Sequence, residues 1–485
     1  MDVVVEVRSQ FLGCALLNLV RGSVLAIILL VACSAIAQAD SVVPAGNAVE
    51  SANATGVART ITTDSSFDGQ NPFFKSLGTN GRSCATCHSL SEGLTLSPES
   101  IQATFDASQG LDPLFAAVDG ANSPTRDMST VEARRANTTL MRTKGLFRVG
   151  LPVPADAEFI LESVDDPYGF ASAKEISCYR RPLPTTNLRF LSSVMWDGRE
   201  LKAGSTVTAA LQQQVRDAVM GHMETTVPPT EVDVTKIVEF ETHLYTTQIS
   251  DDVAGILPSA VAPESLVFQR FFSGINAFLP GAARGNQFNP TVFTFFPQWL
   301  RNRIGRKPPT AQQIAQQSIA RGERIFNTRP FLITNVAGLT DTIERSKALR
   351  RRFNVARPGG PIRGTCSSCH SIPGVGGGSL PLVMNTGVSD AALRTPDMPL
   401  YTFRHKVSGA RVQTTDPGAG IITGKWRDIG AFKVPSLRGI ETRSPYMHNG
   451  FTDDLGEVVN FYDRRFGIGL TPQEKSDLAA FLRVL

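Results

Sequence analysis

Amphipathic helical spacing is the clearest pattern in the last third of the chain. Apolar residues recur three and four positions apart in two segments, one beginning at Leu455 and one covering residues 472–485. The first segment is followed by Gly467, a residue type that commonly ends a helix. The second is preceded by Thr471, which forms a capping box with Glu474. The pattern therefore predicts two helices here.

A third helix is expected to begin near residue 311. Thr310 and Gln313 have the spacing of a capping box, and apolar residues follow at helical intervals as far as Phe326. Alternation of apolar and polar residues, which marks half-buried strands, is scarce along the chain. We therefore predict a mainly α fold with long loops.

Length and composition narrow the class of protein. A chain of 485 residues exceeds one typical domain, and 42% hydrophobic with 19% charged residues excludes a disordered or highly charged protein. A formal net charge of +4 is too small for a dedicated nucleic-acid binder, so we expect no nucleic-acid partner. The 41 glycines and 30 prolines also favour a fold rich in loops.

The N-terminal segment, residues 1–39, has the pattern of a secretory signal peptide. Two arginines precede an apolar run at 24–32, and an Ala-x-Ala cleavage site ends at Ala39. The run is about half as long as a bilayer span requires, so no membrane span is expected. Cys33, directly after the run, gives a second interpretation, a lipoprotein site with a lipid anchor. Both interpretations predict export to the periplasm.

Four of the seven cysteines form two copies of one motif, C-x-x-C-H. The copies are Cys84-Ala85-Thr86-Cys87-His88 and Cys366-Ser367-Ser368-Cys369-His370. This spacing lets two thiols bond the vinyl groups of one porphyrin while the adjacent histidine binds its iron. A redox dithiol needs no following histidine, and a zinc site needs more ligands nearby. We therefore predict two covalently bound haem c groups, with His88 and His370 as iron ligands.

Three further motifs accompany these two. Trp196 opens a W-D-G-R segment, Val434 opens a V-P-x-L-R run, and Pro445 opens a P-Y-x-H-N-G run. Together, these motifs resemble the signatures of the bacterial di-haem cytochrome c peroxidase superfamily, which includes the MauG-like enzymes. The resemblance covers residues 66–250 and 315–485.

The resemblance implies a fold of two tandem cytochrome c-type haem domains. The N-terminal domain would cover residues 40–254 and the C-terminal domain 315–485, with 255–314 as a linker or insertion. Trp196 would lie between the haems on the electron route, although an aromatic core residue at a domain interface would look the same in the sequence. Relatives often bind calcium between the domains, but no carboxylate-rich loop in this sequence identifies a calcium site.

The resemblance also implies a division of labour. Hydrogen peroxide would be reduced at the N-terminal haem, and the C-terminal haem would receive electrons from a small donor protein of the cytochrome c or cupredoxin type. The leading hypothesis is therefore a periplasmic di-haem oxidoreductase with peroxidase activity. The alternatives are a non-enzymatic di-haem electron carrier and a MauG-like oxidase that acts on another protein.

The second axial position of each iron decides between a carrier and a catalyst. Compact relatives place a distal histidine soon after the first motif, but here the next histidine after His88 is His222. His222 could bind the iron or transfer a proton with help from Glu224, or it could be an ordinary surface or core residue. We name His222, Glu224 and Trp196 as the candidate catalytic residues.

Tyr462 and Met447 compete for the second iron. Tyr462 follows His448 by 14 residues, where relatives place a methionine or, in the MauG-like branch, a tyrosine. Met447 lies inside the P-Y-x-H-N-G run. We favour Tyr462 as the ligand, with both residues as core fillers in the alternative interpretation.

Three other features have less certain roles at this point. The basic stretch 301–357 could bind an acidic donor or neutralise haem propionates, or it could be a solvated helix face. Cys178 is expected to be a buried thiol. The length of the stretch 89–194 has no explanation in the sequence.

Overall fold

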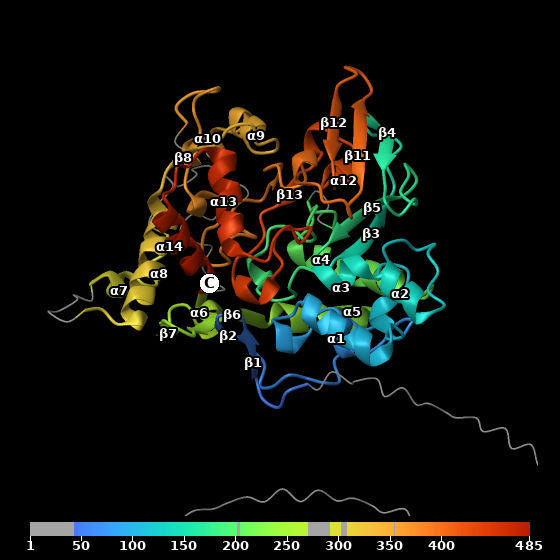
Figure 1. Cartoon of the computed structure of the whole chain (residues 1–485), viewed down its shortest axis with the longest axis horizontal. Coiled ribbons are helices and arrows are strands. Elements are labelled where there is room, and N and C mark those ends of the chain that lie inside the picture. Colours follow the sequence, from blue (N-terminus) through green and yellow to red (C-terminus); the bar gives the residue numbers. More distant parts are fainter. Residues whose placement is uncertain (1–42, 201–203, 270–291, 302–307, 354) are drawn as a thin grey trace, which may run out of the picture. The chain divides into compact units, whose positions relative to one another are not determined.

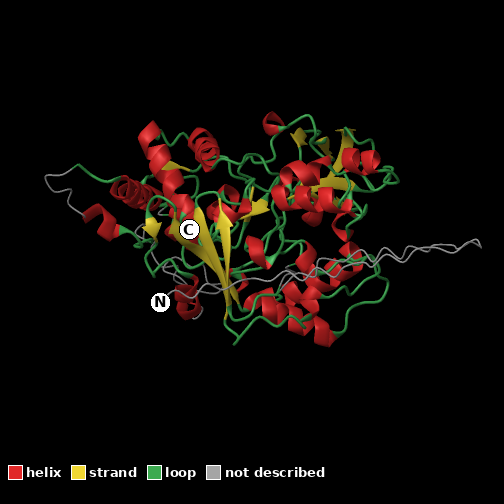
Figure 2. Cartoon of the chain, turned by 60° about the horizontal axis from the view of Figure 1, so that its bottom comes forward, coloured by secondary structure: helices red, strands yellow, loops and turns green. Residues whose placement is uncertain are grey.

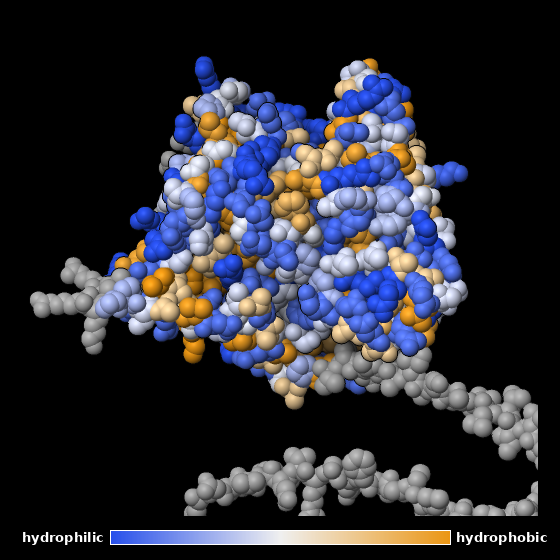
Figure 3. Space-filling view, in the orientation of Figure 1, coloured by the Kyte–Doolittle hydropathy of each residue, from blue (hydrophilic) through white to orange (hydrophobic). Residues whose placement is uncertain are grey.

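The computed structural model describes residues 43–200, 204–269, 292–301, 308–353 and 355–485. The predicted signal peptide, its predicted cleavage site and Cys33 lie outside these ranges. All described residues belong to one compact unit, Ser41–Leu485. The domain boundaries at 254 and 314 stay predictions. Within the described ranges, no helix has both the length and the apolar character that a membrane crossing requires. The face in Figure 3 is mostly hydrophilic, with apolar side chains gathered in small patches.

Helices α8 (Ala311–Thr328) and α14 (Pro472–Arg483) lie side by side, as Figure 1 shows. Both begin with the capping boxes that the sequence predicts, α8 at Thr310 and α14 at Thr471. Phe326 of α8 packs on an aromatic residue of α14, with ring centroids 5.4 Å apart. The predictions of these two helices are confirmed.

Helix α13 (Leu455–Phe466) packs against α14 and confirms the third prediction. It ends at Gly467, whose φ of 58° is a left-handed conformation that glycine adopts without steric cost. The apolar stripe of α13 contributes Leu455 and Val459 to the same core as α8 and α14. Periodicity and caps were therefore sufficient to locate the C-terminal helices.

A second group of helices gathers near the first C-x-x-C-H motif. Helices α4 (Val207–His222) and α5 (Glu231–Thr242) are capped by Thr206 and Thr230, and their buried faces share one apolar core with Phe73. His222 is the last residue of α4, and Glu241 is the next-to-last residue of α5. The ends of both helices thus bring polar side chains to one region.

Thirteen strands form five small antiparallel sheets among the described residues (Figure 2). The four-stranded sheet has the order β1-β2-β6-β7, and the three-stranded sheet has the order β12-β11-β4. Strand β3 pairs with β5, β8 with β9, and β10 with β13. The bounds are β1 Ala48–Asn53, β2 Gly56–Thr62, β3 Phe147–Leu151, β4 Phe159–Asp165, β5 Ile176–Arg180, β6 Leu244–Asp251, β7 Gly255–Ile256, β8 Phe331–Leu332, β9 Arg363–Gly364, β10 Val383–Met384, β11 Leu400–His405, β12 Arg411–Thr414 and β13 Phe432–Lys433.

The predicted fold class, a mainly α protein, is wrong because helices and strands are mixed throughout; the division into two tandem cytochrome c-type domains stays a prediction. All five residues of β5 are buried, and so are the first five of β6. A strand covered on both faces shows no alternation of apolar and polar residues, so the pattern on which we relied could not reveal it. The two-residue strands are too short to carry any pattern.

The stretch 89–194 supplies part of this strand content. It contains β3, β4, β5 and three helices, α1 (Pro98–Ser108), α2 (Val131–Asn137) and α3 (Thr139–Lys144). Strand β4 pairs with β11, which lies more than two hundred residues later in the chain. The stretch therefore connects the N-terminal and C-terminal parts of the protein through a shared sheet.

The remaining helices are short. They are α6 Pro263–Gln269, α7 Pro297–Arg301, α9 Thr340–Arg345, α10 Lys347–Arg352, α11 Cys366–Cys369 and α12 Gly420–Thr423. Helix α11 is formed by the second C-x-x-C motif itself.

The close crossing of α8 and α14 depends on Gly322. A Cβ atom at this position would lie 2.0 Å from the backbone oxygen of Asp477, so one helix would have to move. We expect Gly322→Ala to lower the free energy of unfolding by about 1–3 kcal/mol, measured by chemical denaturation. Gly221→Ala is the matched control, because a Cβ at that helical glycine meets nothing within 4 Å, and it should leave stability unchanged or raise it by up to about 1 kcal/mol. Equal losses in both variants would contradict this view of the crossing.

Candidate functional site

Each C-x-x-C-H motif lines a largely apolar cavity. The first cavity, of about 200 Å³, and the second cavity, of about 230 Å³, are named here after the order of their motifs. The motif residues in their walls are Cys84, Cys87 and His88 for the first, and Cys366, Cys369 and His370 for the second. The structure therefore brings each predicted set of cofactor-binding residues together at its own cavity.

A hydroxyl side chain closes the backbone turn of each motif. The backbone N–H of Ser83 donates to Oγ1 of Thr86 at 3.0 Å, and the N–H of Thr365 donates to Oγ of Ser368 at 2.9 Å. Each bond spans the first cysteine and holds the following residues in a helical turn. Sequence analysis missed these hydroxyls, although a Ser/Thr-x-x-Ser/Thr spacing is present around both motifs.

Both motif histidines are held by the same kind of hydrogen bond. Nδ1 of His88 lies 3.1 Å from the carbonyl oxygen of Leu94, and Nδ1 of His370 lies 3.1 Å from that of Val375. Because a carbonyl only accepts, Nδ1 carries the proton, and Nε2 is the nitrogen left for a metal. Burial lowers the pKa of both imidazoles to about 4, which keeps them neutral, as a metal ligand must be.

The two acceptor residues have an unusual backbone. Leu94 has φ 62° and Val375 has φ 50°, both in the left-handed region that side-chain-bearing residues rarely adopt. Both side chains are fully buried. The left-handed turn at each position directs its carbonyl toward the histidine that precedes it by five or six residues. Sequence analysis found neither residue, because neither is a glycine or an asparagine.

Trp196 lies in the wall that the two cavities share. Its side chain lines both cavities, and its indole Nε1–H donates to the carbonyl oxygen of Arg181 at 2.8 Å. The sequence-based expectation placed this tryptophan between two cofactors, and the structure puts it between the two cavities.

Three cations share this wall with Trp196, two of them buried (Arg181 and Lys433) and one partly buried (Arg443). Arg181, Lys433 and Arg443 line both cavities, and among the described residues their side chains donate hydrogen bonds to backbone carbonyl oxygens. Burial lowers the pKa of Lys433 to about 8 and the pKa values of both arginines to about 10. No ion pair neutralises these three cations within the described ranges, so they can receive carboxylates of a bound group.

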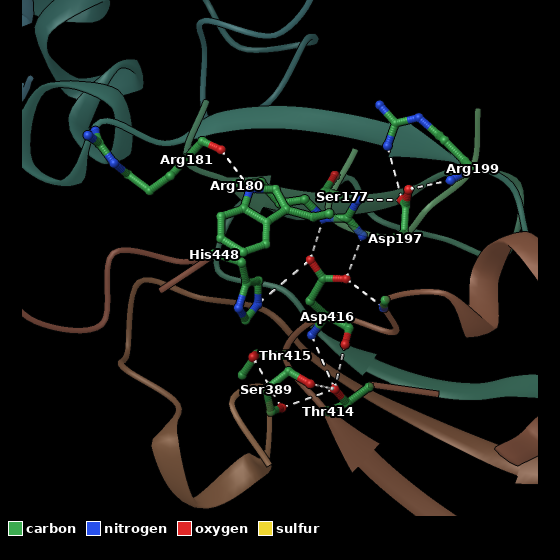
Figure 4. A network of polar contacts seen from close by, with 12 residues as sticks. Ser177, Arg180, Arg181, Asp197, Arg199, Ser389, Thr414, Thr415, Asp416 and His448 are labelled. Carbon is green, nitrogen blue, oxygen red and sulfur yellow. Dashed lines mark hydrogen bonds and ion pairs between the residues drawn. The ribbon is translucent and has the colours of Figure 1, made fainter. Parts of the chain in front are cut away.

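A buried ion network lies beneath the shared wall (Figure 4). The guanidinium of Arg180 donates two bonds to Asp416, at 2.7 and 2.9 Å, and a further short one to Asp197. Arg199 donates to the same Asp197 oxygen at 3.0 Å. Arg180, Asp197 and Asp416 are all buried, so each charge depends on its partners for solvation. The W-D-G-R segment is thereby anchored to β5 and to the loop after β12.

His448 of the P-Y-x-H-N-G run completes this layer. Its ring stacks on Phe432 with centroids 4.2 Å apart and meets Trp196 edge-on at 6.2 Å. Nε2 of His448 lies 3.9 Å from Asp416, beyond hydrogen-bond distance. Burial lowers the pKa of His448 to about 4, so the ring is neutral and acts as an aromatic neighbour of Trp196.

His222, which the sequence suggests as a catalytic residue of the first haem, lies in the wall of the first cavity. Its Nδ1 bonds to Oδ2 of Asp119, whose other oxygen pairs with Arg82. Burial opposes ionisation of Asp119, but the charge of Arg82 and the bond from His222 outweigh burial and lower its pKa. The His222 side chain is 43% exposed, so its other nitrogen is accessible. A carboxylate that holds one imidazole nitrogen orients the other for proton transfer.

Glu224 is linked to His222 through Asn80, whose Nδ2 also donates to the carbonyl oxygen of His222 at 2.8 Å. The Glu224 side chain accepts a hydrogen bond from Nδ2 of Asn80 at 3.0 Å, and its carbonyl accepts one from the hydroxyl of Thr79. It does not belong to the lining of the first cavity. The side chain that bonds to His222 is Asp119, which pairs with Arg82, whereas the sequence had suggested Glu224 as the helper of His222. No spacing in the sequence pointed to Asp119 or Arg82.

Tyr462 and Met447 both line the second cavity, together with Met384. Burial raises the pKa of the Tyr462 phenol to about 12. Met447 has φ 67°, another left-handed residue. The structure thus brings both candidate ligands to the cavity of His370 and leaves the choice between them open.

Cys178 and three arginines of the basic stretch, Arg321, Arg329 and Arg345, line neither cavity. Cys178 is fully buried, as predicted. In the basic stretch, Arg321, Arg329 and Arg345 pair with acidic side chains on the protein itself. Within the part of the chain that the structure describes, no three His, Cys, Asp or Glu side chains gather as they would around a metal ion.

No protein-family model matches the chain. The chain is 36% identical over 140 residues to cytochrome-c peroxidase IdrP1 of Pseudomonas sp. (strain SCT), which covers 25% of this chain and 36% of that protein. It is 32% identical over 123 residues to cytochrome c551 peroxidase of Nitrosomonas europaea, with 25% and 30% covered. The matches span about a third of the length of these relatives.

Among solved structures, a MauG-like protein associated with microbial copper homeostasis aligns with 16% sequence identity and a TM-score of 0.28. The alignment covers 65% of this chain and 77% of that chain. The sequence matches confirm the resemblance to cytochrome c peroxidases that the motifs indicated.

Arg180 should be a major determinant of stability. Arg180→Met leaves Asp197 and Asp416 buried without their main partner, and we expect the free energy of unfolding to fall by about 3–5 kcal/mol. Arg345→Met is the control, because Arg345 forms an exposed pair with Asp341 and should change stability by less than about 1 kcal/mol. Denaturant titration of both variants tests the difference, and similar losses would show that the buried network does not stabilise the fold.

Proposed function

We propose that the protein is a di-haem oxidoreductase of the cytochrome c peroxidase kind, which reduces hydrogen peroxide with electrons from a small donor protein. One observation carries the proposal: two cavities, each with a C-x-x-C-H motif and a fixed, neutral histidine, share a wall that contains Trp196. The named activity of the matching relatives supports the same conclusion.

The residues present fit a covalently bound haem in each cavity. The cysteine pairs would form the thioether bonds, and Nε2 of His88 and His370 would bind iron. Arg181, Lys433 and Arg443, which form no ion pair with an acidic side chain among the described residues, suit the propionates of such groups. When bound, each haem would supply one-electron redox chemistry at its iron.

His222 is the proton-transfer residue of this proposal. Reduction of one hydrogen peroxide to two waters consumes two electrons and two protons, so a group must deliver protons to the peroxide oxygens. The Nε2 atom of His222 is free to do so, since Asp119 holds Nδ1 and Arg82 keeps Asp119 ionised. Glu224 is not given a part, because its side chain is bound to Asn80 outside the cavity.

The two cavities differ in ways that support different roles. The first cavity has His222 and Asp119 in its wall, whereas the lining of the second contains no Asp or Glu and has Tyr462 and Met447 instead. We assign peroxide reduction to the first cavity and electron entry to the second. Electrons would cross the shared wall at Trp196, whose ring contacts His448 edge-on.

A second function, oxidation of another protein in the manner of MauG-like enzymes, is favoured by one observation. Tyr462 lines the second cavity, and a tyrosine ligand stabilises high oxidation states of iron. The donor would be a cytochrome c or a cupredoxin in the first function and a substrate protein in the second. Both functions fit a periplasmic location, as the N-terminal pattern predicts.

Peroxide-dependent oxidation of a reduced small cytochrome is the direct test of the activity. We expect His222→Ala to lower kcat by about 10²- to 10⁴-fold with both haems still attached, because a proton donor is lost. His243→Ala is the matched control: His243 also bonds to a carboxylate, Asp64, at 2.9 Å, but lies outside both cavities and should leave kcat unchanged. Absence of turnover with low-spin spectra at both irons would instead identify an electron carrier.

Haem stoichiometry tests the two cavities independently of activity. The wild type should contain two covalent haems per chain, and either double variant, Cys84→Ser with Cys87→Ser or Cys366→Ser with Cys369→Ser, should contain one. Pyridine haemochrome absorption together with the mass of the denatured protein measures this ratio. Cys178→Ser is the control and should retain two, since Cys178 is buried away from both cavities. A single haem in the wild type would refute the di-haem proposal.

A further inference from the structure

A buried carboxyl group without a partner lies in the first cavity. Glu241, on α5, is 3% exposed and belongs to the lining of this cavity together with Cys84. Its Oε2 atom has no hydrogen-bond partner among the described residues. Burial alone raises the pKa of Glu241 to about 8. The mechanism proposed above does not use this group.

The surroundings of Glu241 explain why no nearby charge or hydrogen bond offsets the effect of burial on its pKa. Apolar residues of α4, α5 and the turn at Phe73 pack around this part of the helix. The charged or titratable side chains on the elements packed against α5, and on α5 itself, are Arg189, Arg216, Asp217, His222, Glu231, Asp233, Lys236 and Glu239. None of them changes the pKa of Glu241. Burial and, after it, the charge of Glu241 raise the pKa of the Cys84 thiol. In the haem-loaded protein Cys84 would be a thioether, which does not titrate.

Other buried acids near the cavities are already engaged. Asp119 is bound by Arg82 and His222. Glu323, on α8, is buried to the same degree as Glu241, but its two oxygens accept the backbone N–H groups of Phe295 and Phe296, and it lines neither cavity. Glu241 therefore differs from them in having a free carboxyl oxygen at a cavity wall.

We propose that Glu241 is a proton-binding site whose occupancy follows the oxidation state of the first haem. The inference rests on the proposed function in requiring a haem in the first cavity. When Glu241 is ionised and one electron enters that cavity, the carboxylate takes one proton from solvent and becomes a neutral acid, and it releases that proton when the electron leaves. A carboxylate with few polar neighbours is sensitive to one added charge nearby, because the low local dielectric screens that charge weakly.

The sign of the effect follows from this coupling. Reduction adds negative charge and raises the pKa of Glu241 further, so the reduced form binds the proton more tightly than the oxidised form. The midpoint potential of the first haem should therefore fall as pH rises above the oxidised-state pKa, by up to about 59 mV for each tenfold change in proton concentration. Below that pKa the acid is neutral in both states, and the potential should be independent of this group.

Spectroelectrochemical titration of the haem-loaded protein over a pH series spanning 8 tests the inference. We expect Glu241→Gln to abolish the slope for the first haem, since glutamine imitates the neutral acid, while Glu323→Gln retains the wild-type slope. A wild type without a slope, or an unchanged slope in Glu241→Gln, would overturn the inference. Both results can be obtained with a protein that shows no peroxide turnover, so failure of the proposed function and failure of the inference are distinct.

Infrared spectroscopy provides a measurement that needs no variant. The redox difference spectrum of the wild type above pH 8 should contain a carboxylic acid band that gains intensity on reduction and shifts in D₂O. Absence of such a band would overturn the inference even if Glu241→Gln failed to fold or to take up haem.

Discussion

The buried charge network around Arg180 determines how the two cavities meet. Arg180 ends β5, Asp197 belongs to the W-D-G-R segment, and Asp416 follows β12, so three distant segments converge on one guanidinium. Removing such charges from water costs several kcal/mol for each ion, and the cost is offset only if all partners are present in good geometry. The network therefore permits one arrangement of these segments. Arg181 and Trp196, which are adjacent in sequence to Arg180 and Asp197, both line the two cavities.

The asymmetry of the cavities follows from which segments reach them. α4 and α5 bring His222 and Glu241 to the first cavity, while α13 and the P-Y-x-H-N-G run bring Tyr462 and Met447 to the second. The shared wall is cationic on both sides. Among the described residues, carboxyl groups line the first cavity and not the second, although both cavities are built around the same five-residue motif.

Sequence patterns identified what is local and missed what depends on chain crossings. The caps at Thr310 and Thr471 and the stop at Gly467 are contained in a few consecutive residues, and all three occur as predicted. Strand β5 was not predicted because both of its faces are buried and its sequence therefore shows no alternation of apolar and polar residues. Asp119 was not identified because it meets His222 only after the chain has folded back over about a hundred residues. His222 could be named as a candidate from the sequence because the chain has few histidines. Glu241 could not, because its sequence context is that of any glutamate on an amphipathic helix.

The two left-handed residues, Leu94 and Val375, show how local strain can be retained at a functional position. A left-handed conformation costs a residue with a side chain about 1–2 kcal/mol, and glycine would avoid that cost. Glycine, however, would give up a fully buried apolar side chain, whose burial contributes about 1.5–3 kcal/mol. The two quantities are similar, so a leucine or valine that both fills the core and directs its carbonyl at a histidine costs the fold little. The same solution at both motifs, with different side chains and loop lengths, indicates that the direction of the carbonyl is the constrained feature, because it determines which histidine nitrogen faces each cavity.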